Sequence, residues 1–132
     1  MSLDLNSVFF DLWSEPLVLP WAIGDFVKAV NKFDGTAVLK TFKDDALVND
    51  VQREFFGKTA IGKWVQRQIV TPRVTITVID IREHYDDYIV TAIIDGALDK
   101  TNLPDSLVLT FYFTLRGDEI ARLIILRNKP AV

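Results

Sequence analysis

The amino-acid sequence predicts an α+β fold in which helices come first and a sheet of antiparallel strands follows. Apolar residues recur at helical spacing in the first half of the chain, and the pattern changes to a period of two after Pro72. Four long alternating segments then follow one another, joined by short turns. Helices followed by a run of hairpin-connected strands indicate helices packed on one face of an antiparallel sheet.

The length of 132 residues is that of one ordinary domain. We therefore expect a single domain over 1–132, with a core over 20–128 and an N-terminal extension or lid over 1–19. A short helix is one interpretation of this N-terminal segment. It would close over the core with the apolar residues Val8, Phe9, Phe10, Leu12 and Trp13.

Three helices are predicted ahead of the sheet. Pro20 suits the entry to a helix over 21–33, whose apolar residues recur at intervals of three and four. The pair Asp34-Gly35 is a stop signal for this helix, and a second helix is predicted over 36–42. The third helix is predicted over 59–69, since apolar residues there again share one face.

Strands account for most of the remaining chain. Two short strands are predicted over 46–50 and 53–56. Four longer strands complete the sheet: 73–84, 88–98, 106–115 and 119–127. Turn residues separate the four, with the Arg116-Gly117-Asp118 turn before the last one.

The strand predicted over 106–115 lacks a cleanly polar face, and the neighbouring strand over 88–98 is apolar on both faces. One face is wholly apolar, and the other carries mainly Val, Thr and Tyr: Val108, Thr110, Tyr112 and Thr114. A sheet with one face in water would show a cleanly polar face. Because three helices can cover one face, we expect the other face to be covered by a second copy, in a homodimer packed through the sheet.

Composition excludes several kinds of site. The chain has no cysteine, so disulfides, thiolate zinc sites and thiol nucleophiles are excluded. His84 is the single histidine, which excludes a metal site built on two or three histidines, and it falls in a polar segment typical of a surface hairpin. We expect no cofactor and no metal.

Charge and hydropathy bear on location and partners. The formal net charge is −3 and the pI is about 5.0, which argues against a surface that binds nucleic acid. A signal peptide begins with positively charged residues, but the first 20 residues contain no Lys or Arg. No stretch approaches the roughly 20 apolar residues of a membrane span. A cytoplasmic protein without a membrane partner is expected.

Four sequence segments resemble the SnoaL-like, nuclear transport factor 2-like superfamily. They are FVKAVNKFD at 26–34, LKTFKDDALVND at 39–50, GKTAIGKW at 57–64 and FTLRGDEIARL at 113–123. The resemblance extends over about 20–128. It implies a cystatin-like cone, in which N-terminal helices pack in the concave face of a curved antiparallel (mixed) sheet around an apolar pocket. It also implies a dimer formed through the sheet.

The superfamily includes ketosteroid isomerases, polyketide cyclases, epoxide hydrolases, dehydratases and non-catalytic binding proteins. Because these activities differ, the resemblance implies a functional residue only where the residue at the matching position of this chain carries the same chemical group. The general-base carboxylate of the isomerases matches Asp50. Their oxyanion-binding tyrosine falls at Phe26, and their protonated carboxylic acid falls near Thr110. Two of three functional groups are therefore replaced, and loss of one strong oxyanion donor costs about 10²–10³ in rate.

The predicted catalytic residues are Asp50, as general base, with Tyr112 and Thr110 as polar partners. A carboxylate at an apolar cavity is suited to proton abstraction. Tyr112 and Thr110 lie two residues apart on one strand and therefore project the same way. The alternatives are that Asp50 caps a turn or faces solvent, and that Tyr112 and Thr110 lie in the dimer interface.

A second set of residues is predicted to line the ligand pocket. Aromatic side chains can stack on a flat ligand or simply fill the core, and Asp95 would be a second inward carboxylate. The pocket set is Trp13, Phe26, Trp64, Asp95 and Leu123. Arg127 is expected to pair with a surface acid rather than lie at the pocket mouth.

These expectations lead to one functional hypothesis and its alternatives. The chain is expected to bind a small hydrophobic molecule and to act as an acid/base isomerase, cyclase, dehydratase or hydrolase through Asp50. The main alternative is a non-catalytic ligand-binding or dimerisation module. A protein-interaction adaptor would instead carry an exposed apolar patch away from the dimer face.

Overall fold

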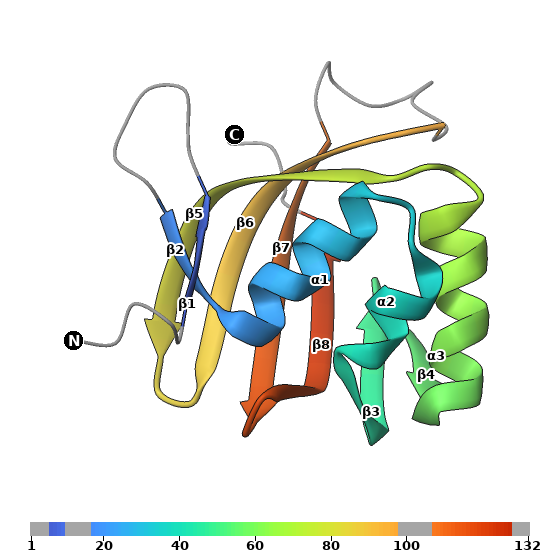
Figure 1. Cartoon of the computed structure of the whole chain (residues 1–132), viewed down its shortest axis with the longest axis horizontal. Coiled ribbons are helices and arrows are strands. Elements are labelled where there is room, and N and C mark those ends of the chain that lie inside the picture. The colour runs from blue at the N-terminus through green and yellow to red at the C-terminus, as the bar shows by residue number, and fades with distance from the viewer. Residues whose placement is uncertain (1–5, 10–16, 98–106, 128–132) are drawn as a thin grey trace.

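The computed structural model describes residues 6–9, 17–97 and 107–127, which form helices and a curved sheet (Figure 1). The elements, in chain order, are β1 (Asn6–Phe9), β2 (Leu17–Pro20), α1 (Trp21–Asn31), α2 (Gly35–Lys40), β3 (Phe42–Asp50), β4 (Arg53–Phe56), α3 (Gly57–Val65), the π-helical segment η2 (Gln66–Val70), β5 (Thr75–His84), β6 (Asp87–Asp95), β7 (Leu107–Arg116) and β8 (Glu119–Arg127).

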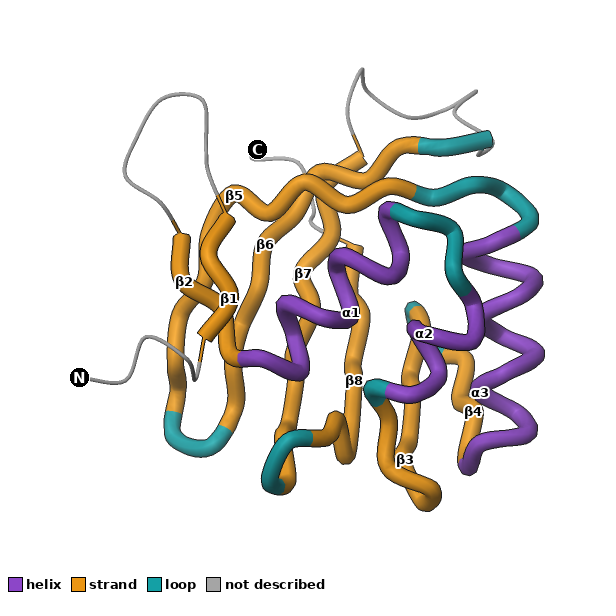
Figure 2. The backbone as a smooth tube through the Cα atoms, in the orientation of Figure 1, coloured by secondary structure: helices purple, strands orange, loops and turns teal. Residues whose placement is uncertain are grey.

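The main sheet has six strands in the order β4-β3-β8-β7-β6-β5. All neighbouring strands are antiparallel except β3 and β8, which run parallel, so the sheet is mixed. The helix α1 crosses one face of the sheet, and α3 lies beside β3 and β4 (Figure 2). The predicted α+β fold, with helices packed on one face of a curved sheet, is confirmed.

The ends of α1 follow from local sequence. Pro20 precedes the first helical residue, and Phe33, with φ of 57°, ends the helical path. Asp34 then serves as the N-cap of α2, since its side chain accepts a hydrogen bond from the Ala37 N–H at 3.1 Å. The Asp34-Gly35 pair therefore starts the second helix as well as separating it from the first.

A side-chain amide joins the end of α1 to the sheet. Asn31 donates from Nδ2 to the carbonyl oxygen of Ile76 at 3.0 Å and accepts from the Ile76 N–H at 2.7 Å. Ile76 belongs to β5, the outermost strand of the sheet on that side. These two bonds fix the distance between α1 and β5, which form two sides of the site described below.

The first strand of the main sheet is longer than the sequence pattern indicated. It begins at Phe42 rather than at Ala46, and α2 ends at Lys40. Phe42 pairs with Ile120 of β8, and the pairing register shifts between Phe42 and Leu47. This parallel pairing joins segments far apart in the sequence, so local periodicity could not reveal it.

The N-terminal prediction was wrong where it can be compared with the structure. Residues 6–9 form the strand β1, which pairs antiparallel with β2, in place of a short helix. Leu19 of β2 is fully buried. Residues 1–5 and 10–16 of the predicted lid, which include Phe10, Leu12 and Trp13, lie outside the described residues.

The core lies between α1 and the inner face of the sheet. Phe26 of α1 contacts Phe42 and Phe113 edge-on, with ring centroids 6.0 and 5.4 Å apart. All three rings are almost fully buried. Within the described ranges, no helix has the length and apolar character needed to cross a membrane.

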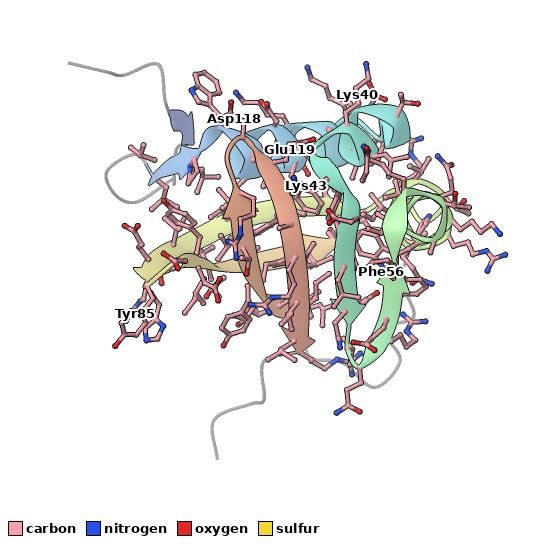
Figure 3. All side chains as sticks on the ribbon, turned by 90° about the horizontal axis from the view of Figure 1, so that it is seen from below. Lys40, Lys43, Phe56, Tyr85, Asp118 and Glu119 are labelled. Carbon is pink, nitrogen blue, oxygen red and sulfur yellow. The ribbon has the colours of Figure 1, made fainter. Side chains whose placement is uncertain are left out.

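The two edges of the sheet are seen in Figure 3. Tyr85 projects beyond the β5–β6 hairpin and is 88% exposed, and Phe56 lies at the end of β4 on the other side, 69% exposed. Asp118 and Glu119 mark the β7–β8 turn, which lies next to α1 in this view. The helices leave the opposite face of the central strands without cover from any described element.

Candidate functional site

A cavity of about 370 Å³ lies between α1, the end of α3 with η2, and the inner face of the sheet. Its lining is mostly aliphatic and aromatic: Phe26, Val30, Val51, Trp64, Ile69, Val74, Ile76, Ile94, Leu107, Leu109, Phe111 and Ile125. Four polar side chains complete it: Asp50, Arg53, Gln68 and Arg127. An apolar cavity with a few polar groups is the usual form of a small-molecule site.

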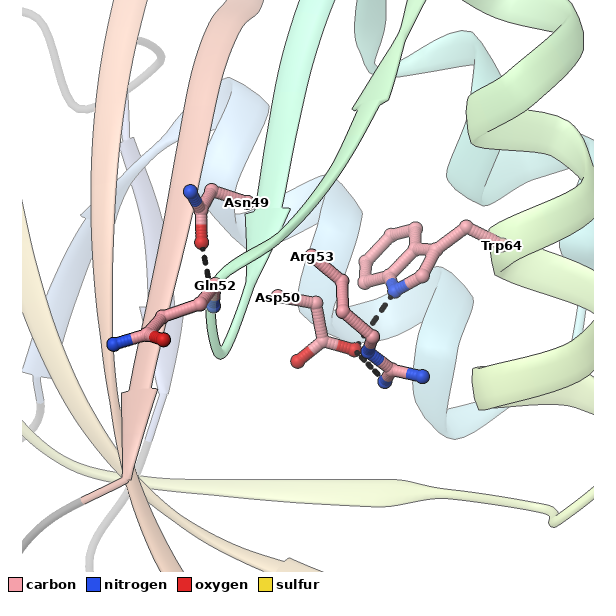
Figure 4. A network of polar contacts seen from close by, with 5 residues as sticks. All are labelled: Asn49, Asp50, Gln52, Arg53 and Trp64. Carbon is pink, nitrogen blue, oxygen red and sulfur yellow. Dashed lines mark hydrogen bonds and ion pairs between the residues drawn. The ribbon is translucent and has the colours of Figure 1, made fainter.

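Asp50, the last residue of β3, points into this cavity. Its Oδ2 accepts hydrogen bonds from Trp64 Nε1 at 3.0 Å and from an Arg53 guanidinium nitrogen at 3.2 Å. Figure 4 shows the indole and the guanidinium approaching the same carboxylate oxygen. The Asp50 side chain is 15% exposed. The two donors fix its orientation and leave Oδ1 without a hydrogen bond from any described residue.

The turn after Asp50 holds Arg53 next to it. Val51 and Gln52 both have positive φ, 49° and 71°, as the two central residues of a type I′ hairpin do. The Val51 N–H donates to the Ile125 carbonyl at 3.0 Å, and the Gln52 N–H donates to Asn49 Oδ1 at 2.9 Å. A β-branched residue in this conformation is strained, and here it lies at the cavity.

Relief of this strain is expected to stabilise the protein. Asn adopts positive φ more readily than Val, so Val51→Asn should raise the free energy of unfolding by about 1 kcal/mol. Val18→Asn is the matched control, because Val18 is similarly exposed but lies in the extended strand β2. Urea denaturation measures both. A Val51→Asn variant no more stable than wild type would contradict the strain.

The π-helical segment places two consecutive residues on the cavity. The π-helical turn at Gln66–Val70 directly follows α3, and both Gln68 and Ile69 line the cavity. Such π-helical turns occur frequently at functional sites. Gln68 brings an amide, which can donate and accept hydrogen bonds, to the same cavity as the Asp50 carboxylate.

The structure brings together some of the predicted residues. Asp50, Phe26 and Trp64 all line the cavity. Leu123 is fully buried in the core and is not among the lining residues. Trp13 lies outside the described residues.

Two predicted catalytic residues lie on the wrong face. Leu109 and Phe111 of β7 line the cavity, so the alternating residues Thr110 and Tyr112 project from the outer face of the sheet. This corrects the expectation that these two hydroxyl groups lie opposite Asp50. Their neighbours across β8, Leu126 and Ile124, belong to the same outer face.

Asp95 also lies outside the cavity. It is exposed, and its Oδ1 accepts a hydrogen bond from the Gly96 N–H at 2.8 Å. The preceding residue, Ile94, lines the cavity instead, because alternation along β6 points the two side chains to opposite sides. The expected second inward carboxylate is therefore corrected.

Three polar residues that line the cavity were not predicted as site residues. Arg53 and Gln68 were not among the predicted residues, and Arg127 was expected at the surface. The predicted strands over 46–50 and 53–56 are separated by exactly two residues, and this signal of a tight hairpin would have placed Arg53 beside Asp50. Gln68 follows Trp64 by four residues, which indicates a shared helical face. Arg127 lines the cavity and has no ion pair with any described residue, contrary to the expected surface pair.

The remaining polar features do not add to this site. In the parts of the chain that the structure describes, no three His, Asp or Glu side chains come close enough together to hold a metal ion. Burial, with the nearby Glu83 carboxylate, raises the pKa of the Tyr88 phenol. Tyr88 does not line this cavity.

Comparisons with known proteins identify similar folds. No family model and no curated protein matches the chain. A candidate polyketide cyclase from Sinorhizobium meliloti is 26% identical, with a TM-score of 0.73, over 82% of this chain and 95% of that one.

Two further solved structures hold or were made for small molecules. A protein with a ketosteroid isomerase-like fold from Catenulispora acidiphila, in complex with trimethylamine, is 18% identical over 81% of this chain and 85% of that one, with a TM-score of 0.69. A computationally designed binder of 17-OHP is 16% identical over 81% and 88%, with a TM-score of 0.68.

Proposed function

Since the chain belongs by its fold to the SnoaL-like, nuclear transport factor 2-like superfamily, we propose that it binds a small hydrophobic molecule in the cavity and acts on it through Asp50. The main observation behind this proposal is the Asp50 carboxylate at an apolar cavity, with its Oδ2 hydrogen-bonded by Trp64 and Arg53. A fixed carboxylate with a second oxygen available has the form of a general base. The likeness to a candidate polyketide cyclase supports acid/base chemistry of this kind.

The reaction class follows from the groups at the cavity. Asp50 would remove a proton from a carbon next to a carbonyl group, as in isomerisation, cyclisation or dehydration, or activate a water molecule in hydrolysis. The developing oxyanion needs a donor. Gln68 lines the same cavity and its amide carries N–H groups, so it takes the place proposed from sequence for Thr110 and Tyr112.

Substitution of Asp50 tests this proposal. Cyclic ketones, epoxides and lactones are incubated with the protein in D₂O, and NMR follows both turnover and exchange of protons next to the carbonyl. Asp50→Asn is expected to lower the rate by about 10²-fold or more, because loss of a positioned general base costs that much. Its melting temperature should remain close to that of wild type, since an asparagine oxygen can still accept from Trp64.

Asp80→Asn is the matched control. Asp80 also pairs with an arginine, Arg82 at 3.0 Å, but does not line the cavity, so this variant should keep full activity. Full activity in Asp50→Asn would overturn the catalytic role of Asp50.

A non-catalytic ligand-binding or dimerisation module is the second candidate. It is favoured by the contacts of Asp50 itself, since the ion pair with Arg53 spans the β3–β4 hairpin and can serve the fold alone. On this hypothesis wild type turns over none of the three compound classes. Asp50→Asn then lowers the melting temperature and leaves ligand binding unchanged.

We also propose that the single domain over 1–132 forms a homodimer through the outer face of the sheet. This face is the surface opposite the helices, and its apolar side chains are half-buried or exposed within one copy. Ile79 and Leu126 are 41% and 42% exposed. The apolar members of the face are Ile79, Ile89, Ile93, Val108, Tyr112, Ile124 and Leu126. Burial of these side chains against a second copy would remove them from water.

A further inference from the structure

The charges that line the cavity do not cancel. Asp50 is paired with Arg53, at 3.2 Å, and Gln68 is neutral. Arg127 adds a second guanidinium to the lining and has no ion pair or hydrogen bond with any described residue. The four polar side chains therefore carry one net positive charge, although the chain as a whole has a net charge of −3.

The topology of β8 aims Arg127 at the cavity. Asp50 ends β3 opposite Ile125 of β8, and β8 continues two residues further. Ile125 lines the cavity, so Arg127, two positions along, lies on the same inner face. Its partner across β7 is Leu109, another lining residue. The Arg127 guanidinium, without a partner among the described residues, therefore lies next to an aliphatic surface.

From this arrangement we infer that the ligand is a monocarboxylate with an aromatic or alicyclic body. The planar guanidinium fork of Arg127 matches the two oxygens of a carboxylate, and one uncompensated charge matches a monoanion. The body would lie against Phe26 and Phe111. Because Asp50 already pairs with Arg53, the guanidinium offsets part of the repulsion between the Asp50 carboxylate and an entering anion. This inference rests on the proposed function, since it names the ligand class of the same cavity.

Two probes of the same shape test the inference. Isothermal titration calorimetry compares 2-naphthoate, which carries a carboxylate, with 2-naphthamide, which is neutral and nearly isosteric. Wild type is expected to bind 2-naphthoate about ten-fold more tightly or better, as expected for a hydrogen bond between charged partners. Arg127→Gln should remove this preference and leave the affinity for 2-naphthamide within about two-fold. Arg127→Lys keeps the positive charge but lacks the planar guanidinium, so it should retain part of the preference for 2-naphthoate.

Arg82→Gln is the matched control, since it removes the same charge from the chain at an exposed site that does not line the cavity. It should bind 2-naphthoate as wild type does, and circular dichroism verifies that each variant is folded. Equal affinity of wild type for the two probes, or a preference that persists in Arg127→Gln, would overturn the carboxylate inference and leave the proposed apolar site standing. If wild type binds neither probe, the inference fails. If the cyclic ketones of the turnover assay also fail to bind, the proposed function fails with it.

Discussion

Replacement of Phe113 by alanine is expected to lower the free energy of unfolding by about 3–5 kcal/mol. Phe113 is 1% exposed, and its ring lies 5.4 Å from Phe26 and 6.1 Å from Phe111, centroid to centroid. A close-packed core relaxes only partly around a deleted side chain, so much of the ring volume would remain as a void. Urea denaturation followed by circular dichroism measures the change.

The same variant should also loosen the ligand site. Phe113 does not line the cavity, but its two ring partners do. Phe56→Ala is the control, since Phe56 is the same residue type and is 69% exposed. We expect it to change the free energy of unfolding by less than about 1 kcal/mol. Equal losses in the two variants would contradict the central place of Phe113 in the core.

A lysine in place of Ile124 is expected to convert the proposed dimer into a monomer. Ile124 lies on the outer face of the sheet, beside Tyr112 on β7 and Asn49 on β3. In a dimer through this face, two lysines would be buried among apolar side chains without partners, which costs several kcal/mol. In the monomer the ammonium group remains in water. Size-exclusion chromatography with light scattering measures the mass directly.

Val18→Lys provides the control for this experiment, because Val18 is 49% exposed on β2 and does not belong to the main sheet. It should leave the dimer intact. A monomeric wild type at micromolar concentration, or a dimeric Ile124→Lys variant that is folded, would rule out dimerisation through the outer face.

Local sequence patterns predicted the helices and strands well where contacts between residues close in sequence determine the structure. The strand over 119–127 was predicted with its exact bounds, and all three helices occur. The start of β3 was missed because its parallel pairing with β8 is a contact between distant segments. The π-helical turn that brings Gln68 and Ile69 to the cavity also leaves no distinct mark in the apolar spacing.

The candidate site was predicted less well, and β7 explains why. Both of its faces carry apolar or weakly polar residues, so the sequence did not settle which face the helices cover. The structure turns the wholly apolar face, with Leu109 and Phe111, toward the cavity, and Thr110 and Tyr112 consequently face outward. Asp50 was found through the family resemblance. Its partner Trp64 is 14 residues away, a contact that no short-range pattern encodes.

The bonds between Asn31 and Ile76 also make one end of the edge strand β5 harder for another molecule to pair with. An outermost strand exposes backbone N–H and C=O groups that can pair with a strand of another molecule. On β5, the Asn31 amide occupies both such groups of Ile76 with bonds of 2.7 and 3.0 Å. An incoming strand would have to break both bonds and then displace the end of α1. A helix residue thus hinders intermolecular strand addition at Ile76, on the edge of the sheet that also borders the ligand cavity.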